Sequence, residues 1–409
     1  MTLLHDANPR RDGFEPGIIH GVLLLMAIWL NGIAGGAISP VLPRIAQHFA
    51  GARNLDLLVG FVGTMPALAV AFLAIPIGSL ADRIGQRPIL LVGLLLYGGL
   101  GMLPLWLESL HGIVASRLVV GVGEAAVMTA GTGMLGLYFH GRTRERWLSA
   151  QVATANIMGV IFVFVGGLIG TQGWRAPFAI YILALLLFVP TFFLIREPSR
   201  PKAARMDPAP PMERAVLFPL ARNMALTVLL ASAIFVVIVQ MSFLLAERGT
   251  TGSATIGTAI SLAACGIALG ATFAGLLTRV PARYRLGAAL AGAAGGFLGL
   301  ALVQSVPAMV MCGFIGGMGC GVGVATLLGA TIAATPAPML GRVSGAWTSA
   351  IFLGQFLNPP LFVIGRALFG SLPAAIVAFA LLCAIAAAVV AFTPQRTVGQ
   401  PTSSPRARG

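Results

Sequence analysis

The sequence has few charged residues. Asp, Glu, Lys and Arg make up 9% of its 409 residues, whereas soluble domains carry about 25%. Hydrophobic residues account for 57% of the chain, and the mean hydropathy is +0.93. This composition excludes a soluble globular protein and predicts an integral membrane protein that crosses the bilayer many times.

Acidic residues are the scarcer of the two charge types. The chain has 12 Asp and Glu against 26 Lys and Arg, which gives a formal net charge of +14. A basic chain can indicate nucleic-acid binding, but here the basic residues are scattered over short loops without interleaved aromatics. Lys and Arg retained on the cytoplasmic side of a membrane protein explain the excess better. We therefore expect a lipid bilayer around the protein and no nucleic-acid partner.

Patterns for metal binding, disulfides and catalysis are absent from the sequence. The four cysteines lie in apolar stretches without a CxxC pair, which is typical of small buried side chains. The five histidines form no HxxH, HExxH or His/Cys cluster. No His/Asp or Ser/His pair lies within an apolar stretch, as an intramembrane enzyme would need. We expect no metal, no cofactor and no enzymatic activity.

Twelve stretches are apolar over the length of about 20 residues that crosses a bilayer. They are 18–42, 57–81, 88–107, 112–138, 147–170, 175–195, 222–246, 254–278, 286–305, 307–334, 343–365 and 370–393. With both termini in the cytoplasm, twenty of the 26 Lys and Arg residues lie on the cytoplasmic side and five on the other. This bias predicts an even number of spans and two cytoplasmic termini.

The longest polar interruption divides these spans six and six. It covers 196–221 and is rich in Pro and in charges of both signs, as in a semi-rigid or disordered spacer. We therefore expect an N-terminal six-helix bundle in 1–195, a cytoplasmic linker, and a C-terminal bundle in 222–409 that ends in a short cytoplasmic tail.

The two halves resemble copies of each other. GVGEA at 121–125 is echoed by GVGVA at 321–325, and the loop that starts at Gly78 is faintly echoed by the one that starts at Gly275. Two echoes at nearly the same offset predict parallel repeats. Such repeats are typical of transporters that expose a central site to each side of the membrane in turn.

The fourth span carries a charge of each sign at membrane depth. By the assignment above, Arg117 and Glu124 are the only Arg or Lys and the only Asp or Glu well inside a span. They are two helical turns apart and share a face, about 10 Å apart along the axis. Ionisable groups at this depth are costly and normally face a protein interior or a water-filled cavity. This helix is therefore predicted to line the working cavity of a transporter.

Three roles for Arg117 and Glu124 remain open. They could form a buried ion pair that fixes helix packing. Glu124 could take up and release a proton, because burial favours the neutral carboxyl group and a nearby Arg favours the charged one. Finally, Arg117 could recognise an anion or Glu124 a cation. Val324 stands at the matching position of the second half, so the helix does not need the carboxyl group, and we favour proton coupling.

Other polar and aromatic side chains are candidates for lining the cavity. They are Trp29, Asn31, Asn156, Gln240, Trp347, Gln355 and Asn358. Amide side chains at lipid depth prefer an interior face, and the two tryptophans could stack on a solute. Hydrogen bonding between helices, without contact to a solute, explains the amides equally well.

Two motifs resemble those of the major facilitator superfamily. The loop after the second span reads Gly78-Ser-Leu-Ala-Asp82-Arg83-Ile-Gly85-Gln-Arg87, which is similar to the family's loop G-x-L-x-D-R-x-G-x-[RK]. The fourth span reads Arg117-x-x-x-Gly121-x-Gly123-x-Ala125, similar to the family's second motif. SPVLPRIAQHF and FLGQFLNPP resemble segments of drug-exporter-like members. The resemblance implies an all-helical membrane protein, with twelve transmembrane helices in two pseudo-symmetric six-helix bundles around a cavity.

The resemblance also assigns a role to the loop, whose glycines permit a tight turn. Asp82 would brace the start of the eleventh helix at 341–344, where a carboxylate meets the positive end of the helix dipole. This contact would hold the cytoplasmic side closed. The alternative is that the charges only set topology, but topology needs Arg and not an Asp followed by Gly85. We therefore favour a cytoplasmic gate.

The sequence also departs from the family's patterns. Many antiporters carry G-P-x-x-G-G in the fifth span, where this chain has Phe162-Val163 followed by Gly166-Gly167. Some drug exporters carry an Asp in the first span, which here reads GIAGGAIS around Ala34.

The leading functional hypothesis is a secondary active transporter in a bacterial inner membrane. We expect a monomer that moves a small organic solute outward by alternating access, driven by the proton gradient. The closest rival is proton-coupled uptake of an organic anion, with Arg117 as counter-ion. A non-transporting receptor or scaffold is the remaining alternative, although the longest loop leaves little room for a soluble domain.

Overall fold

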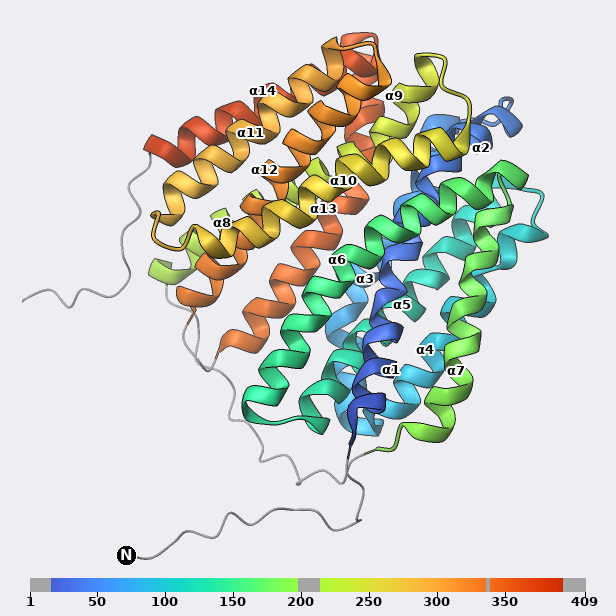
Figure 1. Ribbon diagram of the computed structural model, residues 1–409, viewed down its shortest axis with the longest axis vertical. Coiled ribbons are helices and arrows are strands. Elements are labelled where there is room, and N and C mark those ends of the chain that lie inside the picture. The colour runs from blue at the N-terminus through green and yellow to red at the C-terminus, as the bar shows by residue number, and fades with distance from the viewer. Residues whose placement is uncertain (1–15, 198–213, 336–338, 393–409) are drawn as a thin grey trace, which may run out of the picture.

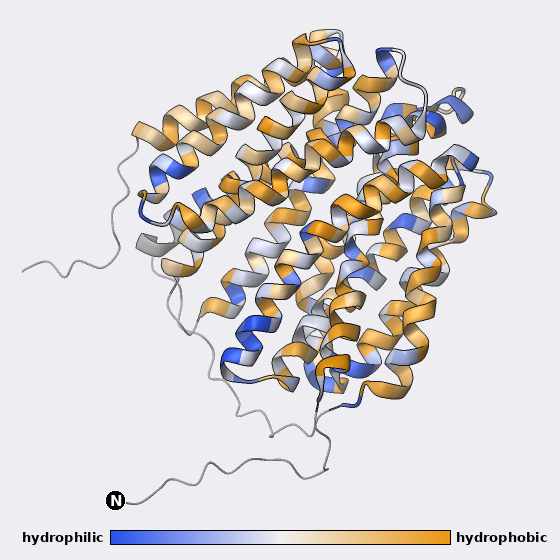
Figure 2. Ribbon diagram, in the orientation of Figure 1, coloured by the Kyte–Doolittle hydropathy of each residue, from blue (hydrophilic) through white to orange (hydrophobic). Residues whose placement is uncertain are grey.

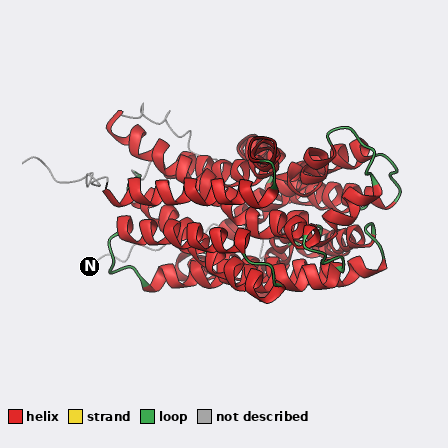
Figure 3. Ribbon diagram, turned by 90° about the horizontal axis from the view of Figure 1, so that it is seen from above, coloured by secondary structure: helices red, strands yellow, loops and turns green. Residues whose placement is uncertain are grey.

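The computed structural model describes residues 16–197, 214–335 and 339–392, and these residues form helices and loops without a strand (Figure 3). The first group comprises α1 (Ile18–Trp29), α2 (Leu42–His48), α3 (Leu55–Ile84), α4 (Gln86–Gly101), α5 (Leu110–Tyr138), α6 (Gly141–Ile169) and α7 (Ile182–Leu194). The second comprises α8 (Arg214–Phe235), α9 (Met241–Glu247), α10 (Ser253–Leu276), α11 (Ala282–Leu302), α12 (Val306–Ala333), α13 (Leu340–Phe369) and α14 (Leu372–Phe392).

The predicted spans are confirmed within a few residues at most boundaries. Eleven helical segments of the described chain are long and apolar enough to cross a membrane, and the pair 18–29 and 33–48, bent by 41°, makes a twelfth. Among the larger differences are the starts of α6 and α8, which precede the predicted spans. Hydropathy marks where a helix enters lipid, whereas the helix itself continues into the polar region.

The two groups of helices lie side by side (Figure 1). We call the end at which α7 stops and α8 starts the linker end, and the opposite end the far end. Hydrophobic residues follow the helices along most of their length, and hydrophilic residues gather near the helix ends and loops (Figure 2). This pattern agrees with helices that cross a bilayer. The division into bundles at 1–195 and 222–409, with a linker between them, stays a prediction, and residues 198–213 of the linker lie outside the described ranges.

The first helix of each group is interrupted by a π-helical turn. These turns are η1 (Ile33–Ala37), between α1 and α2, and η6 (Val236–Gln240), between α8 and α9. The two turns contact each other, and Gly35 faces the ring of Phe235 so closely that an added Cβ would lie 3.3 Å from it. A π-turn contains one residue more than an α-turn, and such turns are frequent at functional sites. Their matching places support the predicted repeat.

Small residues allow the two groups to touch at the far end. A Cβ at Gly60 of α3 would collide with Pro359 of α13, and one at Gly167 of α6 would lie 2.8 Å from Gly257 of α10. Along α3 and α13 the contact continues toward the linker end, where Ser349 donates a hydrogen bond to the carbonyl of Ala71 (2.7 Å). In this structure the far ends of α3, α6, α10 and α13 are therefore packed together.

Candidate functional site

Arg117 of α5 is completely buried and binds three other segments of its group. Its Nε donates to the carbonyl of Val62 in α3 (3.1 Å), and Nη2 donates to the carbonyl of Ala34 in η1 (2.9 Å) and to the hydroxyl of Tyr181. The guanidinium carbon lies 4.9 Å from the ring centre of Tyr181 and 5.8 Å from that of Phe178. Carbonyl dipoles and aromatic faces thus stabilise the buried charge.

This arrangement explains why the π-turn can exist inside an apolar bundle. Ala34 lies in η1, where the regular ladder of backbone hydrogen bonds is disturbed, and the guanidinium supplies a donor to its carbonyl. Tyr97 of α4 adds a second donor, because its hydroxyl binds the carbonyl of Leu30 (2.5 Å) just before the turn. Its ring also packs against Tyr181, with centres 4.9 Å apart. Arg117 is therefore an anchor for the break in the first span.

Glu124 is buried as well, but it does not pair with Arg117. Its side chain is 3% exposed, and its Oε2 atom has no hydrogen-bond partner. Within the described residues, no basic nitrogen lies within 4.0 Å of its carboxyl oxygens. Long side chains in a helix lean toward its N-terminus, so Arg117 reaches away from Glu124. The two side chains therefore form no close ion pair in this structure, and which of the three roles they have stays a prediction.

The cavity candidates of the first span, one at the end of α1 and one just after it, join that span to its neighbours. Trp29 donates from Nε1 to the hydroxyl of Thr154 in α6 (2.7 Å). Asn31 donates to the sulfur of Met128, which lies one turn beyond Glu124 on α5. Both side chains are half-buried, and Asn31 approaches α5 close to the buried carboxyl group.

Two candidates from the second group bind each other. Gln240, the last residue of η6, donates from Nε2 to Oδ1 of Asn358 in α13 (2.7 Å), and Asn358 donates from Nδ2 to the carbonyl of Ser232 in α8 (2.9 Å). Both amides are buried. This pair ties η6 to α13, much as Arg117 ties η1 to α3.

The remaining cavity candidates are less connected. Asn156 binds the carbonyl of Val152 in its own helix (3.1 Å). Trp347 is half-buried, and its Nε1 atom lacks a hydrogen-bond partner. Gln355 is also half-buried, in the middle of α13. The assignment of all seven candidates to a solute cavity stays a prediction.

The loop motif lies between α3 and α4 at the linker end. Gly85 has a φ of +114°, which a glycine adopts without strain, so the predicted tight turn is present. Asp82 accepts a hydrogen bond from Nε2 of Gln86 (3.2 Å), and Arg83 is exposed. Arg87 donates to the carbonyl of Phe192 in α7 (2.7 Å). The predicted contact of Asp82 with the start of α13 stays a prediction.

Glu197, which sequence analysis did not single out, holds this loop. Its two carboxylate oxygens accept hydrogen bonds from the backbone amides of Gln86 (3.0 Å) and Arg87 (2.7 Å). These amides are at the start of α4, where a carboxylate satisfies free N–H groups and complements the helix dipole. The first residues after the sixth span therefore fasten the loop to the start of the linker. The sequence signal that could have indicated this role is the position of an acidic residue directly after a span.

We expect Glu197→Ala to loosen the start of α4. Loss of a helix cap costs about 0.5–2 kcal/mol, and the exposed position of Glu197 places the effect at the lower end. Amide hydrogen exchange at Gln86 and Arg87 should become about two- to fivefold faster. Glu145→Ala, which removes another exposed carboxylate at the linker end, is the control. Unchanged exchange in Glu197→Ala would contradict the capping role.

Comparison with known proteins agrees with this geometry. Residues 24–252 match the family model of the Major Facilitator Superfamily. The match covers just over half of the chain, and the chain belongs to this superfamily. This superfamily consists of membrane transporters with many transmembrane helices, as the sequence predicted.

Two similar proteins are resistance proteins. The chain is 28% identical over 222 residues to the class C tetracycline resistance protein of Escherichia coli, a match covering 53% of this chain and 54% of the relative. It is 26% identical over 201 residues to the quinolone resistance protein NorB of Staphylococcus aureus strain JH9, covering 48% and 41%. The matches thus span about half the length of these relatives.

Solved structures share the whole fold. Crystal structures of a bacterial homologue of the human lysosomal transporter Spinster, in unoccupied and occupied inward-facing conformations, superpose with TM-scores of 0.70 and 0.72. Each alignment covers 91% of this chain at 18% identity, with 94% and 93% of the other chain. This similarity confirms the predicted twelve-span architecture.

Proposed function

We propose that the protein exports a small organic solute across a bacterial inner membrane in exchange for protons, with Glu124 as the proton-responsive group. The observation that carries this proposal is the buried carboxyl group of Glu124, which has an oxygen without a partner and no basic residue beside it. A carboxyl group in such a place is stable when neutral and becomes stable when charged only if a cation or water reaches it.

Proton and solute movement are then coupled, because the two compete for Glu124. A proton and a cationic part of the solute both neutralise Glu124, so binding of one favours release of the other. Alternating access carries the proton inward and the solute outward on the same carboxyl group. The proton gradient supplies the energy, and no cofactor is needed.

Arg117 has a different part in this proposal. Two backbone carbonyls and the Tyr181 hydroxyl accept hydrogen bonds from Nε and Nη2, which supports an anchoring role. Nη1 has no hydrogen-bond partner, but the side chain is completely buried, so an organic anion would have to enter the packed bundle to reach it. This geometry favours Glu124 over Arg117 as the charge that faces a solute, and it favours export of a cation-bearing solute over anion uptake.

The proposed orientation in the membrane rests on the distribution of Lys and Arg, and the proposed direction of transport rests on similar proteins. The excess of Lys and Arg supports a cytoplasmic linker end and cytoplasmic termini. The names of the tetracycline and quinolone resistance proteins point to removal of drug-like molecules from the cell. A receptor or scaffold does not require a buried carboxyl group with an unpartnered oxygen at membrane depth.

Everted membrane vesicles test the proposal directly. Lipophilic cations, organic anions and sugars are added after the vesicle interior has been acidified, and a pH-sensitive dye reports loss of the gradient. We expect lipophilic cations to dissipate the gradient only in vesicles that contain the protein. Gradient-driven movement of organic anions alone would favour the uptake alternative, and no solute-dependent response would favour a scaffold.

A further inference from the structure

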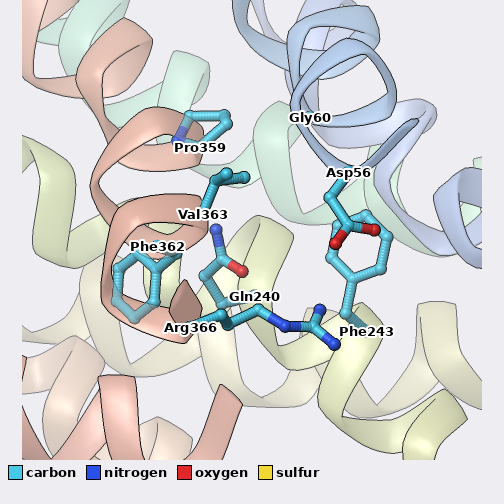
Figure 4. Close-up of a pocket in the computed structure, with 8 residues that line it drawn as sticks. All are labelled: Asp56, Gly60, Gln240, Phe243, Pro359, Phe362, Val363 and Arg366. Atoms are coloured by element: carbon cyan, nitrogen blue, oxygen red, sulfur yellow. The ribbon is translucent and has the colours of Figure 1, made fainter. Parts of the chain in front are cut away.

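A small pocket lies between the two helix groups at the far end (Figure 4). Asp56 and Gly60 of α3 line it from the first group, and residues of η6, α9 and α13 line it from the second. Its enclosed space is about 20 Å³, which is room for about one water-sized group. Asp56 is exposed and Arg366 is just over one-third exposed, so a solute can reach the pocket from solution.

The charges at the pocket leave one carboxylate without a partner. The guanidinium of Arg366 lies on Glu247, with Nη2 2.9 Å from Oε1. The carboxylate of Asp56 is turned into the pocket (Figure 4), but it forms no hydrogen bond or ion pair with any residue that the structure describes. Two acids thus stand against one base, and the free carboxylate favours a cationic ligand.

A buried amide directs a second acceptor into the same space. Gln240 is 5% exposed, and its nitrogen donates to Oδ1 of Asn358 (2.7 Å). This hydrogen bond fixes the orientation of the amide, so that its oxygen is turned into the pocket (Figure 4). No donor from the described part of the chain binds this oxygen. It is therefore available to an N–H group of a ligand.

The ring of Phe243 supplies a third element. It is half-buried and lies beside the carboxylate of Asp56 (Figure 4). An aromatic ring attracts a cation placed over its face. A metal ion such as Ca²⁺ would require six to eight oxygen ligands, more than Asp56 and Gln240 provide. A carboxylate, an amide oxygen and an aromatic ring around a water-sized space suit a compact ammonium group.

We propose that this pocket binds an organic ammonium ion from solution at the far end. The ammonium group occupies the enclosed space and donates to the Asp56 carboxylate and the Gln240 oxygen, while an apolar body lies at the mouth beside Pro359 and Val363. Because the ligand contacts both helix groups, its binding favours the conformation in which their far ends are packed together. Glu124 is not part of the lining, so this site does not depend on the proposed export.

Protection of a cysteine in the pocket from labelling tests the site. Val363→Cys, at a lining position, is introduced after replacement of the four native cysteines. Maleimide labelling of the purified protein in detergent is then followed at increasing concentrations of 2-phenylethylammonium. We expect labelling to slow and the protection to saturate. 2-Phenylethanol and 3-phenylpropanoate carry the same ring with a neutral or an anionic head, and they should protect much more weakly.

Substitutions around the pocket should change the concentration that gives half-maximal protection. This concentration should rise about two- to fivefold in Asp56→Asn and in Phe243→Leu, because each variant loses one attraction for the ammonium group. It should fall by a similar factor in Arg366→Gln, which removes a neighbouring positive charge. Glu108→Gln removes another exposed acid at the far end of the first group and is the matched control, with no change expected.

Equal protection by the ammonium ion and the alcohol would overturn the site, as would an unchanged half-maximal concentration in Asp56→Asn. A role of Asp56 in stabilising the first turn of α3 would give that unchanged value. Protection by 3-phenylpropanoate that is lost in Arg366→Gln would overturn the site in favour of an anion.

The variant Glu124→Gln separates this site from the proposed export. It should retain the protection of the parent, whereas loss of protection would place the ligand at Glu124 and overturn the assignment. The readout needs no proton gradient. The pocket can therefore fail this test while the proposed export holds, or pass it while the proposed export fails.

Discussion

Replacing Glu124 with Gln is expected to abolish the dependence of transport on the pH gradient while the protein stays folded. Gln has nearly the same shape and mimics the protonated carboxyl group, so the buried site of α5 keeps its packing. It cannot release a proton when a cationic solute arrives. Couplings between two ligands are commonly 1–3 kcal/mol, or about 5- to 150-fold in affinity, and this factor should disappear from the ratio of efflux rates with and without the gradient.

Efflux from loaded proteoliposomes at fixed internal pH and varied external pH measures this ratio. Glu108→Gln, which neutralises an exposed acid of the same group, is the control and should retain it. Solute exchange without a gradient should weaken in Glu124→Gln, because the cationic part of the solute loses its counter-charge, while the midpoint of thermal unfolding should stay near that of the parent. Full dependence on pH in Glu124→Gln would assign coupling to another residue and would remove the main support for the proposed function.

Arg117→Ala is expected to have the largest effect on stability. The change leaves the buried carbonyls of Ala34 and Val62 and the hydroxyl of Tyr181 without their donor. A buried polar group that loses its partner costs about 1–3 kcal/mol, so we expect a loss of about 3–6 kcal/mol. The midpoint of thermal unfolding in detergent should fall sharply. Leu118→Ala changes the neighbouring side chain, which is 41% exposed, and should have little effect.

The same variant separates anchoring from anion recognition. If Arg117 binds a substrate anion, Arg117→Ala should keep its unfolding midpoint and lose stabilisation by organic anions. If it anchors η1, the midpoint should fall whether or not an anion is added. Tyr181→Phe should give a smaller fall, about 1 kcal/mol, because the guanidinium keeps both carbonyls. A variant of Arg117 as stable as the parent would show that the interactions at Ala34 and Val62 contribute little.

Much of the fold could be predicted because lipid restricts the choices. Inside a bilayer each backbone group must be satisfied within the protein, so a long apolar stretch is a helix. The twelve spans follow from that rule, and the Lys and Arg content of each loop predicts which helix ends lie on the same side of the membrane. The loop with Gly85 could also be predicted, because its positive φ suits the glycine of the motif.

The arrangement inside the bundles could not be predicted in the same way. Arg117 and Glu124 lie on one helix at a spacing that allows a shared face, but their partners depend on which helices surround α5. Tyr181 and Tyr97 come from two other spans, and no spacing within α5 indicates them. The π-turns could not be predicted from hydropathy, because one extra residue in a helical turn does not change the hydropathy of a span.

The partners of Arg117 also have a consequence for biosynthesis. Its two backbone acceptors, at residues 34 and 62, precede it in the chain, so they leave the ribosome before α5 does. A charged span that enters a membrane after its acceptors can be received by helices already in place, which lowers the cost of exposing a guanidinium to lipid. Tyr181 arrives last and completes the arrangement. The order of the sequence thus suits the order in which a membrane protein is inserted.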